Sequence, residues 1–176
     1  DIPLVIFGEN EAEYGNAIKN GLELAKEDNQ EAFKNLSIII EDNQYNPKQA
    51  LSVLQRLQQK KISLLYQWGE PVLKATASKI ENSKLPTLAM SVDPRPSLDK
   101  EWIIRTINHS DQFAKVIMKR MLDESNTKVI LFVTEDPYLD SLTVGVEKYL
   151  KDLKKENLLT VNRFAPDTND FRASLT

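Results

Sequence analysis

The strongest constraint on the fold is an alternation of short apolar runs with segments of helical periodicity. The runs are strand-sized and rich in β-branched residues, whereas the segments between them repeat apolar residues every three or four positions. This alternation, with strands that are apolar throughout, predicts an α/β fold built on parallel sheets that are covered on both faces. Strands are expected at 2–7, 36–40, 62–66, 85–90, 102–104, 129–133 and 158–164, and helices at 13–28, from 47 onward, at 71–82, 110–122, 136–153 and 169–176.

The same alternation indicates where a ligand would bind. In open parallel sheets, ligands lie beyond the carboxyl ends of the strands. Four loops follow such ends, at 8–11, 67–70, 91–95 and 134–138. The third loop opens an irregular stretch, 91–100, in which Pro94 and Pro96 favour an extended backbone without helix.

Composition excludes several classes of protein. The 176 residues carry a net charge of -3 with both signs mixed, which argues against a dedicated nucleic-acid-binding protein. No apolar run approaches the roughly 18 residues of a membrane span. The chain has no cysteine, so disulfides, thiolate metal sites and a cysteine nucleophile are excluded. Asp1 is not an initiator methionine, which fits a removed signal peptide or a trimmed chain.

Five motifs, in order and nearly without gaps, resemble those of one family. They are YGNAIKNG at 14–21, EDNQYNPKQA at 41–50, LPTLA at 85–89, RTINHSDQ at 105–112 and TNDF at 168–171. Each motif is a weak signal, whereas their common order and spacing are specific. On these motifs the chain resembles the type I periplasmic solute-binding proteins, in the branch of the branched-chain amino-acid-binding proteins.

The resemblance implies a two-lobed fold with parallel, doubly wound α/β sheets. Residues 1–107 would form most of the first lobe without its returning part, and 108–176 would begin the second lobe. The hinge between the lobes would include residues 106–111. Chains of this family are longer, so the resemblance implies a truncated chain. The incomplete lobe edges would then be open to pairing with a second copy as a dimer.

The implied function is solute capture. A small polar molecule would bind between the lobes, which would close about the hinge and deliver it to an ABC permease in the membrane. The resemblance implies a periplasmic or extracytoplasmic location and is compatible with a lipid anchor. It also implies that the protein is not an enzyme and needs no cofactor. Two alternatives stay open: a sensor or interaction domain with a degenerate cleft, and an enzyme of flavodoxin-like type.

The resemblance also indicates the residues of the cleft wall. They are Trp68, Gly69 and Glu70 after the third strand, Ser91, Val92 and Asp93 after the fourth, and Tyr138 in the second lobe. In amino-acid-binding members, a serine in the first of these loops grips the ligand carboxylate. Here that serine is missing, and Val92-Asp93 stands where the family has Ala-Thr. Glu70 and Asp93 would repel a carboxylate unless Arg95 compensates, so another ligand, or none, is expected.

Each of these residues also has a purely structural interpretation. Trp68 could stack on a planar or sugar-like ligand or pack against neighbouring loops. Glu70 is favourable at a helix N-terminus in any case, and Asp93 suits a turn before Pro94. Tyr138 and Arg95 could both be ordinary surface residues. His109 is the only histidine and lies in the expected hinge, and neither a His/Cys metal cluster nor a glycine-rich phosphate loop is present in the sequence.

Overall fold

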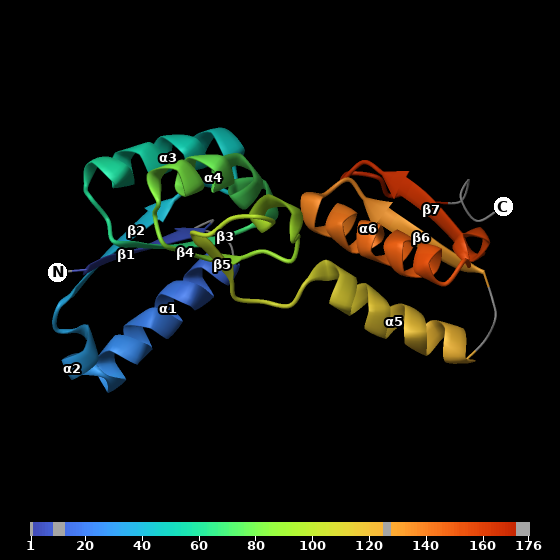
Figure 1. Cartoon of the computed structure of the whole chain (residues 1–176), viewed down its shortest axis with the longest axis horizontal. Coiled ribbons are helices and arrows are strands. Elements are labelled where there is room, and N and C mark those ends of the chain that lie inside the picture. Colours follow the sequence, from blue (N-terminus) through green and yellow to red (C-terminus); the bar gives the residue numbers. More distant parts are fainter. Residues whose placement is uncertain (1, 9–12, 125–127, 172–176) are drawn as a thin grey trace. The chain divides into compact units, whose positions relative to one another are not determined.

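The computed structural model describes residues 2–8, 13–124 and 128–171 and divides into two compact units (Figure 1). Unit 1 comprises residues 1–91 and 95–107, and unit 2 comprises residues 92–94 and 108–176. Within the described ranges, no helix is both long and apolar enough to cross a membrane.

Unit 1 is built on a parallel sheet with the strand order β2-β1-β3-β4-β5. The register aligns Gly8 with Asp42 and Trp68 with Met90, so the carboxyl ends of neighbouring strands lie at one edge of the sheet. The predicted parallel sheet is therefore confirmed. The strands are β1 (Ile2–Gly8), β2 (Leu36–Asp42), β3 (Leu64–Trp68), β4 (Thr87–Met90) and β5 (Ile103–Arg105).

Helices cover both faces of this sheet, as the apolar strands predicted. In Figure 1, α3 (Pro47–Gln59) and α4 (Glu70–Ser83) lie over one face and α1 (Glu13–Asp28) lies under the other. The core packs between α3, α4 and the sheet, and it includes Leu54, Leu57, Leu65, Leu73 and Ile80, all fully buried. Burial of such side chains is the main favourable term in folding.

The helix expected from 47 onward begins there as α3, and a local cap fixes its start. Asn46 has extended backbone, and its Oδ1 accepts hydrogen bonds from Lys48 N at 2.9 Å and Gln49 N at 3.2 Å. Pro47 occupies the first helical position, where a missing N–H costs nothing.

Four local features of unit 1 differ from the predictions. The third and fourth strands begin at Leu64 and Thr87 instead of 62 and 85, and Lys61, in the turn before β3, has a positive φ of 53°. A short helix, α2 (Gln30–Phe33), was not anticipated. The stretch at 91–100 is not helix-free, since Arg95–Ser97 forms the 3₁₀ turn η1. The fixed φ of proline, which was expected to keep this stretch extended, is also compatible with a 3₁₀ turn.

Unit 2 has a smaller parallel sheet of β6 (Val129–Thr134) and β7 (Leu159–Phe164). Its helices are α5 (Ser110–Glu124) and α6 (Pro137–Asp152), followed by the 3₁₀ turn η2 (Glu156–Leu158). The core of this unit comprises Ala114, Met118, Val129, Val146 and Leu150.

The second face of the unit 2 sheet carries exposed apolar side chains. Ile130 and Phe132 are 49% and 43% exposed. Phe132, Phe164 and Phe171 pack on one another, with the Phe164 and Phe171 ring centroids 4.8 Å apart. The helix expected at 169–176 is absent over 169–171, and its remainder lies outside the described residues.

Candidate ligand-binding site

Three side chains meet beyond the carboxyl ends of β2 and β3. The Tyr45 hydroxyl donates a hydrogen bond to Glu70 Oε2 at 3.2 Å. The ring centroids of Tyr45 and Trp68 lie 5.0 Å apart with their planes tilted by 39°. Glu70 is only 6% exposed. These contacts place two aromatic rings and a buried carboxylate in one corner of unit 1, called here the Tyr45–Trp68–Glu70 cluster.

A tight turn after β2 holds Tyr45 in place. Gln44 and Tyr45 have consecutive positive φ values of 51° and 54°, which are unfavourable for residues with a side chain. Asp42 Oδ1 accepts a hydrogen bond from Gln44 N at 2.7 Å, and Asn43 Oδ1 accepts one from Tyr45 N at 2.9 Å. These Asx-type bonds stabilise the turn locally and so fix the Tyr45 ring.

Gly69 lets the Tyr45 ring lie directly on the backbone. Its φ is +107°, in the region that only glycine adopts readily. A Cβ at this position would lie 2.8 Å from Tyr45 Cδ2 and closer still to Cε2. Gly69 N also donates to Met90 O at 3.1 Å, which ties the loop to the end of β4. The cluster therefore requires glycine at position 69.

Two buried side-chain amides lie at the same edge of the sheet. Asn43 and Gln67 are 0% and 1% exposed. Thr76 Oγ1 lies 3.1 Å from Gln67 Oε1. Among the described residues, Asn43 Nδ2 and Gln67 Nε2 have no hydrogen-bond partner. Because buried polar atoms are nearly always paired, these two amide nitrogens are donors that water or a bound molecule would satisfy.

The predicted residues after β4 are buried. Ser91, Val92 and Asp93 are 0%, 3% and 6% exposed, whereas Arg95 is exposed. Ser91 belongs to unit 1, and Val92 and Asp93 are grouped with unit 2, where Ser110 N donates to Val92 O at 2.9 Å.

Tyr138 lies in unit 2, at the start of α6. Its side chain is 40% exposed. Its backbone N–H donates to Asp136 Oδ1 at 2.8 Å, as part of the cap of α6. Of the predicted site residues, the structure therefore brings Trp68, Gly69 and Glu70 together within unit 1.

Tyr45 is the member of the cluster that the sequence did not indicate. It lies within the motif at 41–50, and no pattern in the sequence pairs it with residues near 70. The one available signal was its position, because an aromatic residue in a loop after a strand lies at the ligand-binding edge of a parallel sheet.

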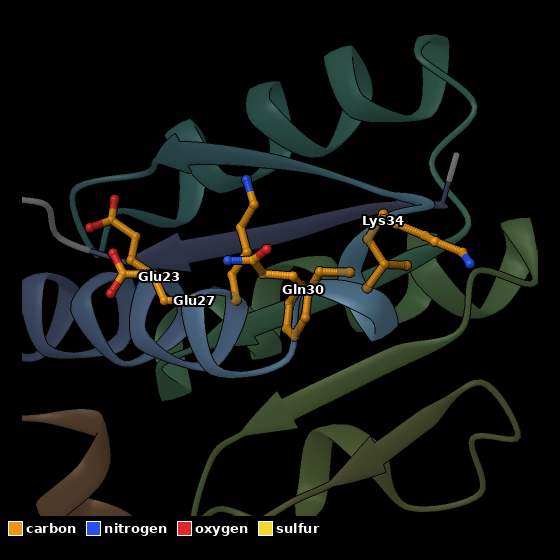
Figure 2. Close-up of a pocket in the computed structure, with 7 residues that line it drawn as sticks. Glu23, Glu27, Gln30 and Lys34 are labelled. Atoms are coloured by element: carbon orange, nitrogen blue, oxygen red, sulfur yellow. The ribbon is translucent and has the colours of Figure 1, made fainter.

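The structure also has a hollow elsewhere on unit 1, away from the carboxyl ends of the strands. The hollow is about 590 Å³, and Figure 2 shows Glu23, Glu27, Gln30 and Lys34 around it. Leu36, the first residue of β2, also lines it, so the hollow lies at the amino end of that strand. Across residues 2–8, 13–124 and 128–171, no group of three or more His, Asp or Glu side chains could hold a metal ion.

Several solved structures share this fold. A fatty acid ABC transporter substrate-binding protein from Thermomonospora curvata matches with a TM-score of 0.79 and 19% identity, covering 99% of this chain and 47% of its own. A solute-binding protein of an ABC transporter from R. palustris, in complex with benzoate, matches with a TM-score of 0.79 and 18% identity, covering 99% and 51%. A leucine-binding protein from Thermotoga maritima matches with a TM-score of 0.77 and 16% identity, covering 99% and 52%.

The chain spans about half the length of these structures. None of the curated proteins is significantly similar to it in sequence. The family model described as "Periplasmic binding protein" matches residues 8–176, nearly the whole sequence. With the parallel α/β units and the motifs that follow their strands, this match is decisive: the chain belongs to the periplasmic binding protein family.

Proposed function

We propose that this chain is part of an extracytoplasmic solute-binding protein that captures a small polar molecule and delivers it to an ABC permease. The family match over residues 8–176 carries the proposal. The ABC-transporter relatives support it, and so does the Tyr45–Trp68–Glu70 cluster, which lies where a parallel sheet binds ligands. The family consists of binding proteins, and we extend to this chain the absence of catalysis and the location outside the cytoplasm.

Capture would use hinge closure. In this proposal residues 1–107 belong to the first lobe, residues 108–176 begin the second, and residues 106–111 form part of the hinge. A ligand that contacts both lobes stabilises the closed state by its differential affinity for that state. The wall of the cleft would comprise Tyr45 and the seven predicted residues, Trp68, Gly69, Glu70, Ser91, Val92, Asp93 and Tyr138.

The test is a thermal-shift screen of the full-length protein against amino acids, polyamines, sugars, aromatic acids, nucleosides and short peptides. A ligand that binds only the folded state adds about 2.7 kcal/mol of stability at a hundredfold excess over its Kd. We expect one chemical class to raise the Tm, and we expect Trp68→Ala to abolish the shift.

Trp102→Ala is the matched control for Trp68→Ala. Trp102 directly precedes β5, at the opposite end of the sheet from Trp68, so its loss should leave the ligand-induced shift intact. A shift that survives Trp68→Ala but disappears with Trp102→Ala would contradict the proposed site.

The missing serine in the loop at 67–70 favours a second candidate, a sensor or interaction domain with a degenerate cleft. This candidate predicts no Tm shift with any class of small molecule. It also predicts a protein partner that the full-length chain retains when Trp68 is replaced by Ala.

A further inference from the structure

One edge of the unit 2 sheet is open for pairing. Among the described strands, β7 pairs with β6 alone. Glu135 N donates to Phe164 O at 2.8 Å, so the backbone groups of Phe164 point towards β6. Backbone groups alternate in direction along a strand, and those of Val161 and Arg163 therefore point to the open side. Outward N–H and C=O groups at the edge of a sheet are a template for another strand.

The sequence of β7 lacks the features that usually block an open edge. It contains neither proline nor lysine. Its one charged residue, Arg163, is held on α6 by an ion pair with Asp140 at 3.0 Å. Because proteins normally protect sheet edges with proline or with charged side chains, this edge fits a partner strand better than open water.

A hollow lies beside this edge, between β7 and α6. Its volume is about 540 Å³. Apolar side chains from both elements line it, and so do charged side chains of α6: Leu159 and Val161 from β7, and Val144, Glu147, Lys148, Leu150 and Lys151 from α6. A strand added to β7 would place every second side chain on the α6 side of the sheet, over this hollow.

We propose that β7 pairs edge to edge with β7 of a second copy of the protein, so that the two β6–β7 sheets become one continuous sheet about a twofold axis. Identical strands related by such an axis run antiparallel, and the two hollows then lie next to each other. This interface is separate from the solute site of unit 1.

The charges on α6 favour a second copy as the partner. Glu147 and Lys151 are exposed, line the hollow and lie one helical turn apart on the same face of α6. The twofold axis makes the two α6 helices antiparallel, so Glu147 of each copy faces Lys151 of the other. Opposite charges therefore meet at two equivalent points, which is the self-complementarity that a symmetric dimer requires.

Strands of a longer chain would leave this edge open. Unit 1 begins with β1-α1-α2-β2, and unit 2 has the matching order β6-α6-η2-β7. In unit 1 the next strand, β3, pairs with β1 and leaves β2 at the edge of the sheet. The chain spans about half the length of the structures that it matches, and further strands added in the same order would pair with β6, not with β7.

The first test is the oligomeric state of the full-length protein, measured by sedimentation velocity from micromolar to near-millimolar concentration. We expect a reversible equilibrium between monomer and dimer. Glu147→Lys places like charges opposite each other at two equivalent points, so the Kd of the dimer should rise about tenfold or more. The double variant Glu147→Lys with Lys151→Glu restores opposite charges and should recover most of the affinity.

Glu23→Lys is the matched control for Glu147→Lys. Glu23 is also exposed on a helix, and it lines the hollow of unit 1 instead of that of unit 2. The same reversal of charge at this position should leave the Kd of the dimer unchanged.

Hydrogen exchange locates the interface. Pairing of β7 protects the N–H groups of Val161 and Arg163, so peptides that cover residues 159–164 should exchange more slowly above the Kd of the dimer than below it. Peptides that cover β2, the edge strand of unit 1, should exchange at the same rate at both concentrations.

Three results would overturn the proposal. They are a protein that stays monomeric over the whole range, a dimer whose Kd does not respond to Glu147→Lys, and exchange in β7 that does not depend on concentration. A monomer in which β7 is already protected would show that another part of the full-length chain covers this edge. Solute capture is tested separately, by the thermal-shift screen, and stands or falls independently of the dimer.

Discussion

Two junctions between a strand and a helix use the same residue types differently. Both β3–α4 and β6–α6 contain an acidic residue followed by proline, Glu70-Pro71 in the first and Asp136-Pro137 in the second. Asp136 is the N-cap of its own helix, and its Oδ1 accepts hydrogen bonds from Tyr138 N and Leu139 N. Glu70 instead lies within its helix, where its Oε2 accepts from Tyr45, 25 residues earlier.

The residue before the acid accounts for this difference. In β3–α4 the N-cap position is held by Gly69, which has a φ of +107° and no side chain to cap the helix. The carboxylate is thereby shifted one position into the helix and faces a loop from another strand. An acid–proline pair therefore marks a helix start in both places. Where glycine precedes the pair, as in β3–α4, the acid does not cap the helix and its carboxylate joins the candidate site instead.

The largest expected effect comes from replacing that glycine. Gly69→Ala would combine backbone strain at positive φ with a collision against the Tyr45 ring, which is held by its bond to Glu70. We expect the free energy of unfolding to fall by about 2–4 kcal/mol in urea titration. Binding of any ligand that requires Tyr45 should weaken as well.

Gly21→Ala provides the contrast. Gly21 lies in α1, and a Cβ there would meet nothing within 4 Å. Alanine should therefore stabilise the protein by about 0.5–1 kcal/mol. A Gly69→Ala protein that is as stable as Gly21→Ala would contradict the account of the β3–α4 junction.

The β6–α6 junction should respond to loss of its cap. Asp136→Ala removes the acceptor for two helix N–H groups, so the free energy of unfolding should fall by about 1 kcal/mol. Asp136→Asn keeps the acceptor and should recover most of that loss. If Asn is as destabilising as Ala, then the charge of Asp136, and not its hydrogen bonds, stabilises the helix.

Local signals in the sequence predicted much of this architecture. The helix starts expected at 47 and 136 are confirmed, and each lies at an Asn-Pro or Asp-Pro pair whose capping depends only on residues a few positions apart. The alternation of apolar strands with helices likewise predicted the parallel sheet. Such features are encoded locally, and a single sequence therefore suffices to find them.

Long-range features could not be read in the same way. The bond from Tyr45 to Glu70 depends on a turn with two positive φ values and on a strand order that places β1 between β2 and β3. Neither leaves a periodic signal. Trp68 and Glu70 were identified by family resemblance, and Tyr45 became visible only in three dimensions.

A smaller effect should separate the hydroxyl of Tyr45 from its ring. Tyr45→Phe keeps the contact with Trp68 and removes the hydrogen bond to Glu70, so we expect a loss of about 1 kcal/mol in the free energy of unfolding. Tyr66→Phe is the comparison within β3. The pKa of Tyr66 is raised by burial, and its hydroxyl contacts the weak acceptor Met90 Sδ at 3.3 Å, so its removal should cost less. Equal losses would show that the Tyr45–Glu70 bond contributes nothing specific.

The smallest effect on stability is expected at Tyr138. This residue tests whether the β6–α6 junction contributes to ligand binding as the β3–α4 junction is proposed to do. Its ring is 40% exposed and only its backbone takes part in the cap of α6, so Tyr138→Ala should change the free energy of unfolding by no more than about 0.5 kcal/mol. As part of the proposed cleft wall, the ring should still contact the ligand, and we expect Tyr138→Ala to bind it several-fold more weakly in calorimetry on the full-length protein.

Tyr149→Ala is not a suitable control, because that ring packs against the core of unit 2. Leu153→Ala is suitable, since Leu153 is similarly exposed, at 43%, and caps the opposite end of α6. If both substitutions leave affinity unchanged, the β6–α6 junction only begins a helix, and ligand recognition on this chain rests on the β3–α4 junction.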